Sequence, residues 1–120
     1  MLALLDEDPQ MLAWWGTSVE VVSALARRER ERILSADEVT AGLAVLRDLS
    51  NSWHTIVPSE PLRRVAERLL RVHPLRAADS LQLAAALIAA DRDPANLALV
   101  CLDERLTAAA RREGFTVIDR

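Results

Sequence analysis

Several residue types that functional sites often use are scarce in this sequence. Its single cysteine, Cys101, excludes an internal disulfide framework and a zinc site built from cysteines. Three glycines are too few for a glycine-rich phosphate loop, so the usual nucleotide-binding fingerprints are absent. The longest apolar run, residues 83–90, is far too short to cross a membrane, and the first residues lack the basic segment of a secretory signal. These absences predict a cytoplasmic protein without membrane association.

Lysine is absent too, so every basic side chain apart from histidine is an arginine. The net charge of −3 excludes a nucleic-acid binder that relies on overall positive charge. Arginine binds phosphate through a planar fork, so the sequence still allows local contacts with phosphate groups.

The residues that are present describe one globular domain. A chain of 120 residues, 51% hydrophobic and 28% charged, is long enough to bury a single core. Alanine and leucine are abundant, which favours helices. We therefore expect one helix-rich domain over residues 1–120.

Helix starts are marked by capping residues that precede apolar side chains at helical spacing. Residues 17–20 (TSVE) and 35–38 (SADE) both have the form of a capping box. The predicted helices cover residues 17 to about 32, 36–49, 60–73, 79–90 and 104–113, with a further short helix over residues 9–15.

Three short apolar runs, at residues 55–57, 97–102 and 115–118, are the predicted strands. Helices separate them, which favours an α/β fold with a short parallel sheet. The chain itself begins in an apparent helix. We therefore expect that the strand which normally opens such a domain is missing.

Three acidic residues, Glu20, Asp79 and Asp103, each lie at the start of a predicted helix. Asp103 also follows the strongest predicted strand, at the sheet edge where ligands bind in α/β proteins. Carboxylates that converge there repel one another unless a cation neutralises them, and oxygen ligands select Mg²⁺ or Mn²⁺. The matching chemistry is metal-assisted hydrolysis of a phosphodiester. Taken singly, each acid is also explained as a helix-capping residue.

Three stretches of the chain resemble the PIN-domain ribonucleases of the VapC type, which are toxins of bacterial type II toxin–antitoxin operons. They are WGTSVEVVSALARRER (15–30), HPLRAADSLQLAAAL (73–87) and LVCLDERLTAAARREGFTVI (99–118), in the family's order. The resemblance implies a three-layer α/β/α domain with a short parallel sheet and helices on both faces. It also implies about four acids around Mg²⁺ or Mn²⁺, of which the second, third and fourth fall on Glu20, Asp79 and Asp103.

The family's first acid has no counterpart in this sequence. That acid ends an opening strand, in an Asp-Thr/Ser-Ser pair, whereas residues 1–7 here resemble the stretch just after it. Residues 6–8 (DED) are expected to end a first helix and face solvent, which makes them poor substitutes. Two interpretations stay open: the chain start is placed too late, or the protein is a degenerate, inactive member.

Three further side chains have a functional and a structural interpretation. Ser18 either hydrogen-bonds a metal-bound water or caps a helix. Arg27 either contacts RNA phosphate or pairs with Glu31 one turn later, which is the interpretation we favour. Arg76 either contacts phosphate or forms a salt bridge.

Two functions from different classes follow from these observations. The first is a metal-dependent endoribonuclease toxin that hydrolyses RNA and is silenced by a cognate antitoxin protein. The resemblance also implies a homodimer, with the apolar helix after Ser35 as a candidate for the contact. The second is a catalytically inactive PIN-like protein that binds RNA or a protein partner, which the missing first acid supports.

Overall fold

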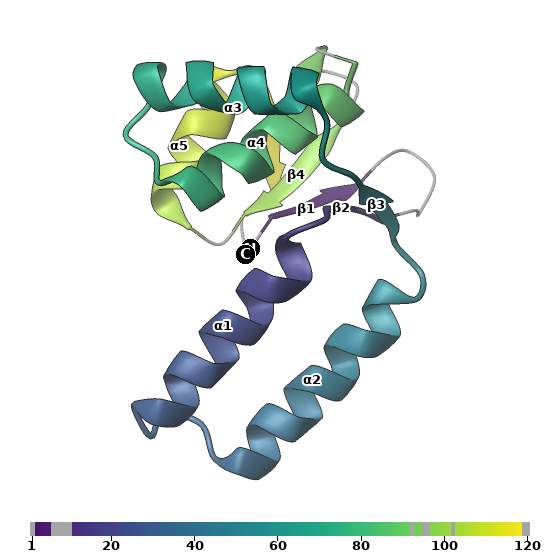
Figure 1. The fold of residues 1–120 in the computed structure, drawn as a ribbon, viewed down its shortest axis with the longest axis vertical. Coiled ribbons are helices and arrows are strands. Elements are labelled where there is room, and N and C mark those ends of the chain that lie inside the picture. The colour runs from purple at the N-terminus through teal and green to yellow at the C-terminus, as the bar shows by residue number, and fades with distance from the viewer. Residues whose placement is uncertain (1, 6–10, 92, 95–96, 102, 119–120) are drawn as a thin grey trace.

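The structure, a computed structural model, describes residues 2–5, 11–91, 93–94, 97–101 and 103–118. These residues form an α/β arrangement of five α-helices and five strands (Figure 1). Their order is β1 (Leu2–Leu5), β2 (Met11–Trp14), α1 (Thr17–Arg30), α2 (Ala36–Ser50), β3 (His54–Ile56), α3 (Glu60–Val72), α4 (Ala77–Ala89), β4 (Ala98–Cys101), α5 (Glu104–Arg112) and β5 (Thr116–Ile118).

Two parallel strand pairs form the sheet, and β1 lies between them. β2 pairs with β3, with Trp14 opposite Ile56, and β4 pairs with β5, with Leu99 opposite Val117. β1 runs antiparallel to both β2 and β4, which gives the order β3-β2-β1-β4-β5. Because both neighbours oppose β1, β2 and β4 run in the same direction. The predicted α/β class with parallel strands is confirmed, and the antiparallel β1 is an addition to it.

The sequence interpretation of the N-terminal region was wrong in two places. The chain opens with the strand β1 rather than a helix, and the predicted helix over residues 9–15 is instead the strand β2. A short apolar run fits either element by periodicity alone, and here pairing with neighbouring strands decides the outcome. The predicted solvent-facing position of residues 6–8 lies outside the described residues.

Helix α4 forms the centre of the hydrophobic core. Its buried residues include Leu83, Ala86 and Leu87, so the helix is enclosed on most sides. Alanines make up much of its surface, and their small side chains allow α3 to pack closely against it. α3 turns towards α4 the apolar stripe that the sequence predicts, which includes Leu62 and Leu69.

The sheet and α5 complete the core around α4. Trp14 from β2 and Leu99 from β4 are both buried in the same cluster, and Leu106 enters it from α5. Burial of a leucine such as Leu99 stabilises the fold by about 1.5–3 kcal/mol relative to exposure. None of the described helices is both long and apolar enough to span a membrane.

Helices α1 and α2 form a hairpin that extends away from the sheet (Figure 1). The two helices pack on each other, yet Thr17 and Val39 are their only buried residues. Several apolar side chains of the hairpin face solvent, among them Val19, Ile33 and Val45. This pair therefore does not form a second helical layer on the sheet.

A partly buried network of ionisable side chains joins the ends of α3 and α5. His73, which caps the C-terminus of α3, donates from Nε2 to Oε2 of Glu113 at 2.7 Å. Arg68 donates to the other carboxylate oxygen of Glu113 at 3.2 Å. Burial alone would raise the pKa of Glu113, but the hydrogen bonds from His73 and Arg68 outweigh it and hold this pKa below its ordinary value.

We predict that Glu113→Gln lowers the free energy of unfolding by about 1–2 kcal/mol at neutral pH, because it removes charge-assisted hydrogen bonds. The folded-state pKa of Glu113 is lowered, so its carboxylate stabilises the protein above the ordinary value of 4.5. That contribution is lost as the pH falls through the folded-state pKa. Urea unfolding at about pH 7 and about pH 3 measures the difference between variant and parent.

The matched control is Glu67→Gln, which changes an exposed glutamate on α3. We expect it to leave the free energy of unfolding within about 0.5 kcal/mol of the parent. A Glu113→Gln deficit of the same size at both pH values would contradict the role given to the carboxylate charge.

Candidate functional site

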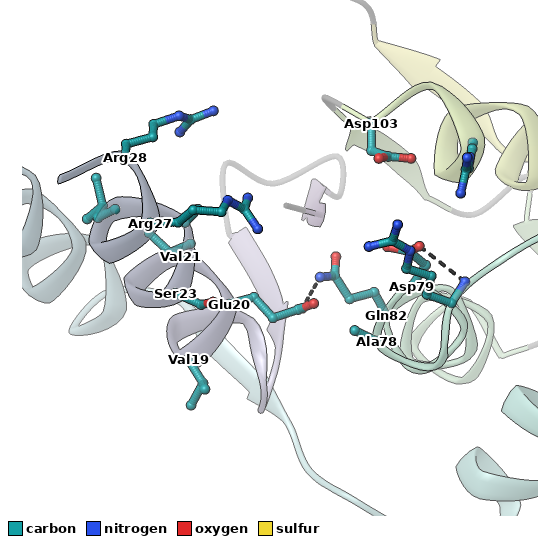
Figure 2. Close-up of a pocket in the computed structure, with 14 residues that line it drawn as sticks. Val19, Glu20, Val21, Ser23, Arg27, Arg28, Ala78, Asp79, Gln82 and Asp103 are labelled. Atoms are coloured by element: carbon teal, nitrogen blue, oxygen red, sulfur yellow. Dashed lines mark hydrogen bonds between the residues drawn. The ribbon is translucent and has the colours of Figure 1, made fainter. Parts of the chain in front are cut away.

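A pocket of about 810 Å³ lies where α1, α4 and the start of α5 approach one another. Glu20, Asp79 and Asp103 all line it, although they are far apart in the sequence (Figure 2). The strand directions explain this arrangement. α1 follows β2, and α5 follows β4; since β2 and β4 run in the same direction, both helices start from the same edge of the sheet.

Glu20 lies in the first turn of α1, but not in the predicted capping box. The N-cap of α1 is Gly16, and no side chain caps this helix. A Cβ at Gly16 would approach Nε1 of Trp14 to 2.6 Å, so the tight turn after β2 requires glycine there. Thr17 is instead the first residue of the helix, and its buried Oγ1 has no hydrogen-bond partner among the described residues.

The carboxylate of Glu20 is partly buried and accepts a hydrogen bond from Nε2 of Gln82 (Figure 2). Burial raises the pKa of Glu20, and the negative charge of Asp79 adds to the rise, while the bond from Gln82 opposes it. The site therefore holds two carboxylates whose charges disfavour each other. A bound cation would relieve that repulsion.

Asp79 occupies the third position of α4 rather than its N-cap. The helix begins two residues earlier than predicted, at Ala77, with Arg76 as its N-cap. The carboxylate of Asp79 accepts a long hydrogen bond of 3.4 Å from the backbone N–H of Arg76. Alanines at positions 77 and 78 favour helix, which explains the earlier start.

Asp103 is the N-cap of α5, as the sequence predicts. Its Oδ1 accepts from the backbone N–H of Leu106 at 2.9 Å. The residue is exposed and lies on the far side of the pocket from Glu20 (Figure 2). Asp103 therefore caps α5 and also lines the pocket.

The three acids share one pocket without converging on one point. Within the described part of the chain, no three His, Cys, Asp or Glu side chains are grouped so that they could hold a metal ion. Glu20, Asp79 and Gln82 all line this pocket, and Figure 2 shows the Gln82 amide between the carboxylates of Glu20 and Asp79. An all-oxygen set of this kind suits Mg²⁺ or Mn²⁺ in its chemistry.

Sequence reasoning missed Gln82 as a site residue and treated it as part of a cap. Gln82 is 2% exposed, and its buried Oε1 has no hydrogen-bond partner within the described part of the chain. An unpaired buried oxygen of this kind costs about 1–3 kcal/mol. The signal that could have found it is its spacing, because Gln82 follows Asp79 by three residues and shares its helix face.

Four arginines line the same pocket. Arg27 and Arg76 were predicted near the site, and the structure adds Arg28 and Arg105. None of the four is ion-paired with an acidic residue among those that the structure describes, so the favoured pairing of Arg27 with Glu31 is absent. Their guanidinium groups remain available to an anionic ligand.

Ser18 does not have its predicted capping role, whereas its hydrogen bond to a metal-bound water stays a prediction. It does not cap α1, whose N-cap is Gly16, and it is not among the residues that line the pocket. It follows Thr17 in the first turn, where the neighbouring Val19 and Glu20 take the positions that face the pocket.

The chain was compared with protein-family models, with curated proteins and with solved structures. None of the three comparisons gives a significant match.

Proposed function

We propose that this protein is a metal-dependent endoribonuclease with a PIN-like fold, of the kind that serves as the toxin of a toxin–antitoxin pair. One observation carries the proposal. Three acids from segments far apart in the sequence line a single pocket together with four arginines. Acids supply ligands for a hard cation, and arginines supply contacts for phosphate, so the two sets together fit a phosphodiester substrate.

Each group has a distinct task in this proposal. Glu20 and Asp79 would hold a Mg²⁺ or Mn²⁺ ion, with Asp103 lining the same pocket from the start of α5. When bound, the ion supplies Lewis acidity and lowers the pKa of a water molecule. Hydrolysis of the RNA backbone would add one water molecule across a P–O bond. Arg27 and Arg76 bind the flanking phosphates and orient the strand.

The PIN-like fold is supported by the coarse architecture. The described chain is α/β, and β2 and β4 share a direction on either side of one central strand. The three resembling stretches carry Glu20, Asp79 and Asp103 to the pocket. A cytoplasmic location, where RNA is available, accords with the single cysteine.

A cognate antitoxin and a second copy of the chain are the protein partners in this proposal. The α1–α2 hairpin supports a protein contact of this kind. Its exposed apolar side chains, including Val19, Ile33 and Val45, form no part of the core cluster. Exposed apolar surface of this sort is typical of interaction sites.

A catalytically inactive PIN-like protein that binds RNA is the second candidate. The separation of the three acids favours it, because the described residues include no grouping of three potential metal ligands from His, Cys, Asp and Glu. The arginines of the pocket would then retain RNA without turnover.

We predict that the protein cleaves RNA in the presence of Mn²⁺ and that Asp79→Asn reduces the rate by at least about 10²-fold, since it removes a charge that holds the cation. Glu20→Gln is expected to have an effect of the same order. Gel analysis of a mixed RNA substrate measures cleavage, and circular dichroism checks that the variants fold. Asp37→Asn, an exposed acid on α2, is the matched control and is expected to cleave normally.

Two results separate the candidate functions. Cleavage that survives Asp79→Asn and Glu20→Gln unchanged rejects the endoribonuclease. RNA binding by the parent chain without any Mn²⁺-dependent cleavage selects the inactive RNA-binding protein instead.

We also predict that Arg27→Ala and Arg76→Ala weaken RNA binding mainly through the loss of phosphate contacts. Each contact releases counterions, so each substitution should reduce the slope of log Kd against log salt concentration by about 0.7–0.9. Fluorescence anisotropy with a labelled RNA at several salt concentrations measures the slope. Arg64→Ala, which changes an exposed arginine on α3 outside the pocket, should leave it unchanged. If Arg27→Ala and Arg76→Ala have the same slope as Arg64→Ala and the parent chain, the pocket arginines do not contact phosphate.

A further inference from the structure

Gln82 presents an unusual combination of burial and incomplete hydrogen bonding. It lies on α4, one turn beyond Asp79, and lines the pocket although only 2% of its surface is exposed. Its Nε2 donates to Oε2 of Glu20 on α1. A carboxylate can only accept, so this contact sets the orientation of the amide group and turns Oε1 away from Glu20.

Oε1 of Gln82 is buried and has no hydrogen-bond partner among the residues that the structure describes. Native proteins rarely leave such an acceptor unpaired, and each case calls for a ligand or a donor that satisfies it. Figure 2 shows the Gln82 amide between the carboxylates of Glu20 and Asp79, on the pocket side of α4. An amide oxygen between two carboxylates is a favourable environment for a cation rather than for an anion.

We propose that Oε1 of Gln82 is a direct ligand of the divalent cation in this pocket, together with Glu20 and Asp79. Its Nε2 holds the carboxylate of Glu20 in place at the same time. This inference rests on the proposed metal-dependent function and changes its ligand set. The third ligand is a neutral amide on α4, in place of Asp103, whose Oδ1 is engaged in capping α5.

The competing explanation is that an arginine of the pocket donates to Oε1 in solution. Arg27 and Arg76 both line the same space and carry enough donors to do so. Under that explanation Gln82 only packs against its neighbours and positions them. The preference of the site for one metal over another then does not depend on which atom ends the side chain at position 82.

The first experiment exploits ligand softness. Gln82→Met places a thioether near the position of the amide, and Gln82→Leu is the matched variant without a donor atom. We expect both to weaken Mn²⁺ binding about tenfold or more, as measured by electron paramagnetic resonance of free Mn²⁺. A thioether prefers soft metals. The ratio of Cd²⁺ affinity to Mn²⁺ affinity should therefore be at least about tenfold higher in Gln82→Met than in Gln82→Leu.

The second experiment uses the parent chain and needs no variant to fold. The sequence has two glutamines, Gln10 and Gln82, so selective ¹³C labelling of the glutamine Cδ gives two resonances. Titration with Mg²⁺ should shift the Gln82 carbonyl resonance, with Gln10 as the internal reference. The resonance of Gln82 is assigned as the one that is missing from either variant.

Three outcomes decide the matter. A Gln82 resonance that moves with Mg²⁺, together with a distinct Cd²⁺ preference in Gln82→Met, supports ligation. An unmoved resonance, or the same metal preference in both variants, while Asp79→Asn still weakens Mn²⁺ binding, overturns the inference but leaves the proposed function standing. Mn²⁺ binding that is absent from the parent, or indifferent to Asp79→Asn, overturns both.

Discussion

The enclosure of α4 is the constraint on which the rest of the structure depends. Its apolar residues are surrounded by α3, α5 and the sheet, so the helix has little freedom to rotate or slide. The same helix presents Asp79 and Gln82 to the pocket. The position of these two polar groups is therefore determined by the packing of leucines and alanines on the other sides of the helix.

The second constraint is the direction of the strands. β2 and β4 flank β1 and run the same way, so the segments that follow them reach one edge of the sheet. This common edge brings the turn that carries Glu20 towards the cap that carries Asp103. The carboxylates of the site repel one another, so both constraints are needed to keep them in one pocket with the arginines.

Much of the helical structure could be predicted from local signals. Ser35 and Ser59 cap their helices as expected, and Gly114, with a φ of +102°, ends α5 where the pattern predicts. The short apolar runs near the N-terminus could not be assigned, because strand pairing rather than local preference decides their conformation.

The sequence predicts three acids at helix starts, but it does not predict how far apart their carboxylates lie in the fold. The contact between Gln82 and Glu20 spans 62 positions of the chain, and no local pattern encodes it. Likewise, Asp79 was expected to cap its helix, whereas it occupies the third position of α4. The helix starts two residues before Asp79, because Ala77 and Ala78 favour helix. Gln82 then faces Glu20 on α1.

The hairpin of α1 and α2 has one more consequence. It buries few of its side chains and contributes none to the core cluster, so we expect it to open locally at a lower free energy than α3 or α4. Glu20 belongs to that weaker unit, whereas Asp79 and Gln82 belong to the stronger one. The two walls of the pocket therefore come from parts of the molecule that differ in how much apolar surface holds them in place.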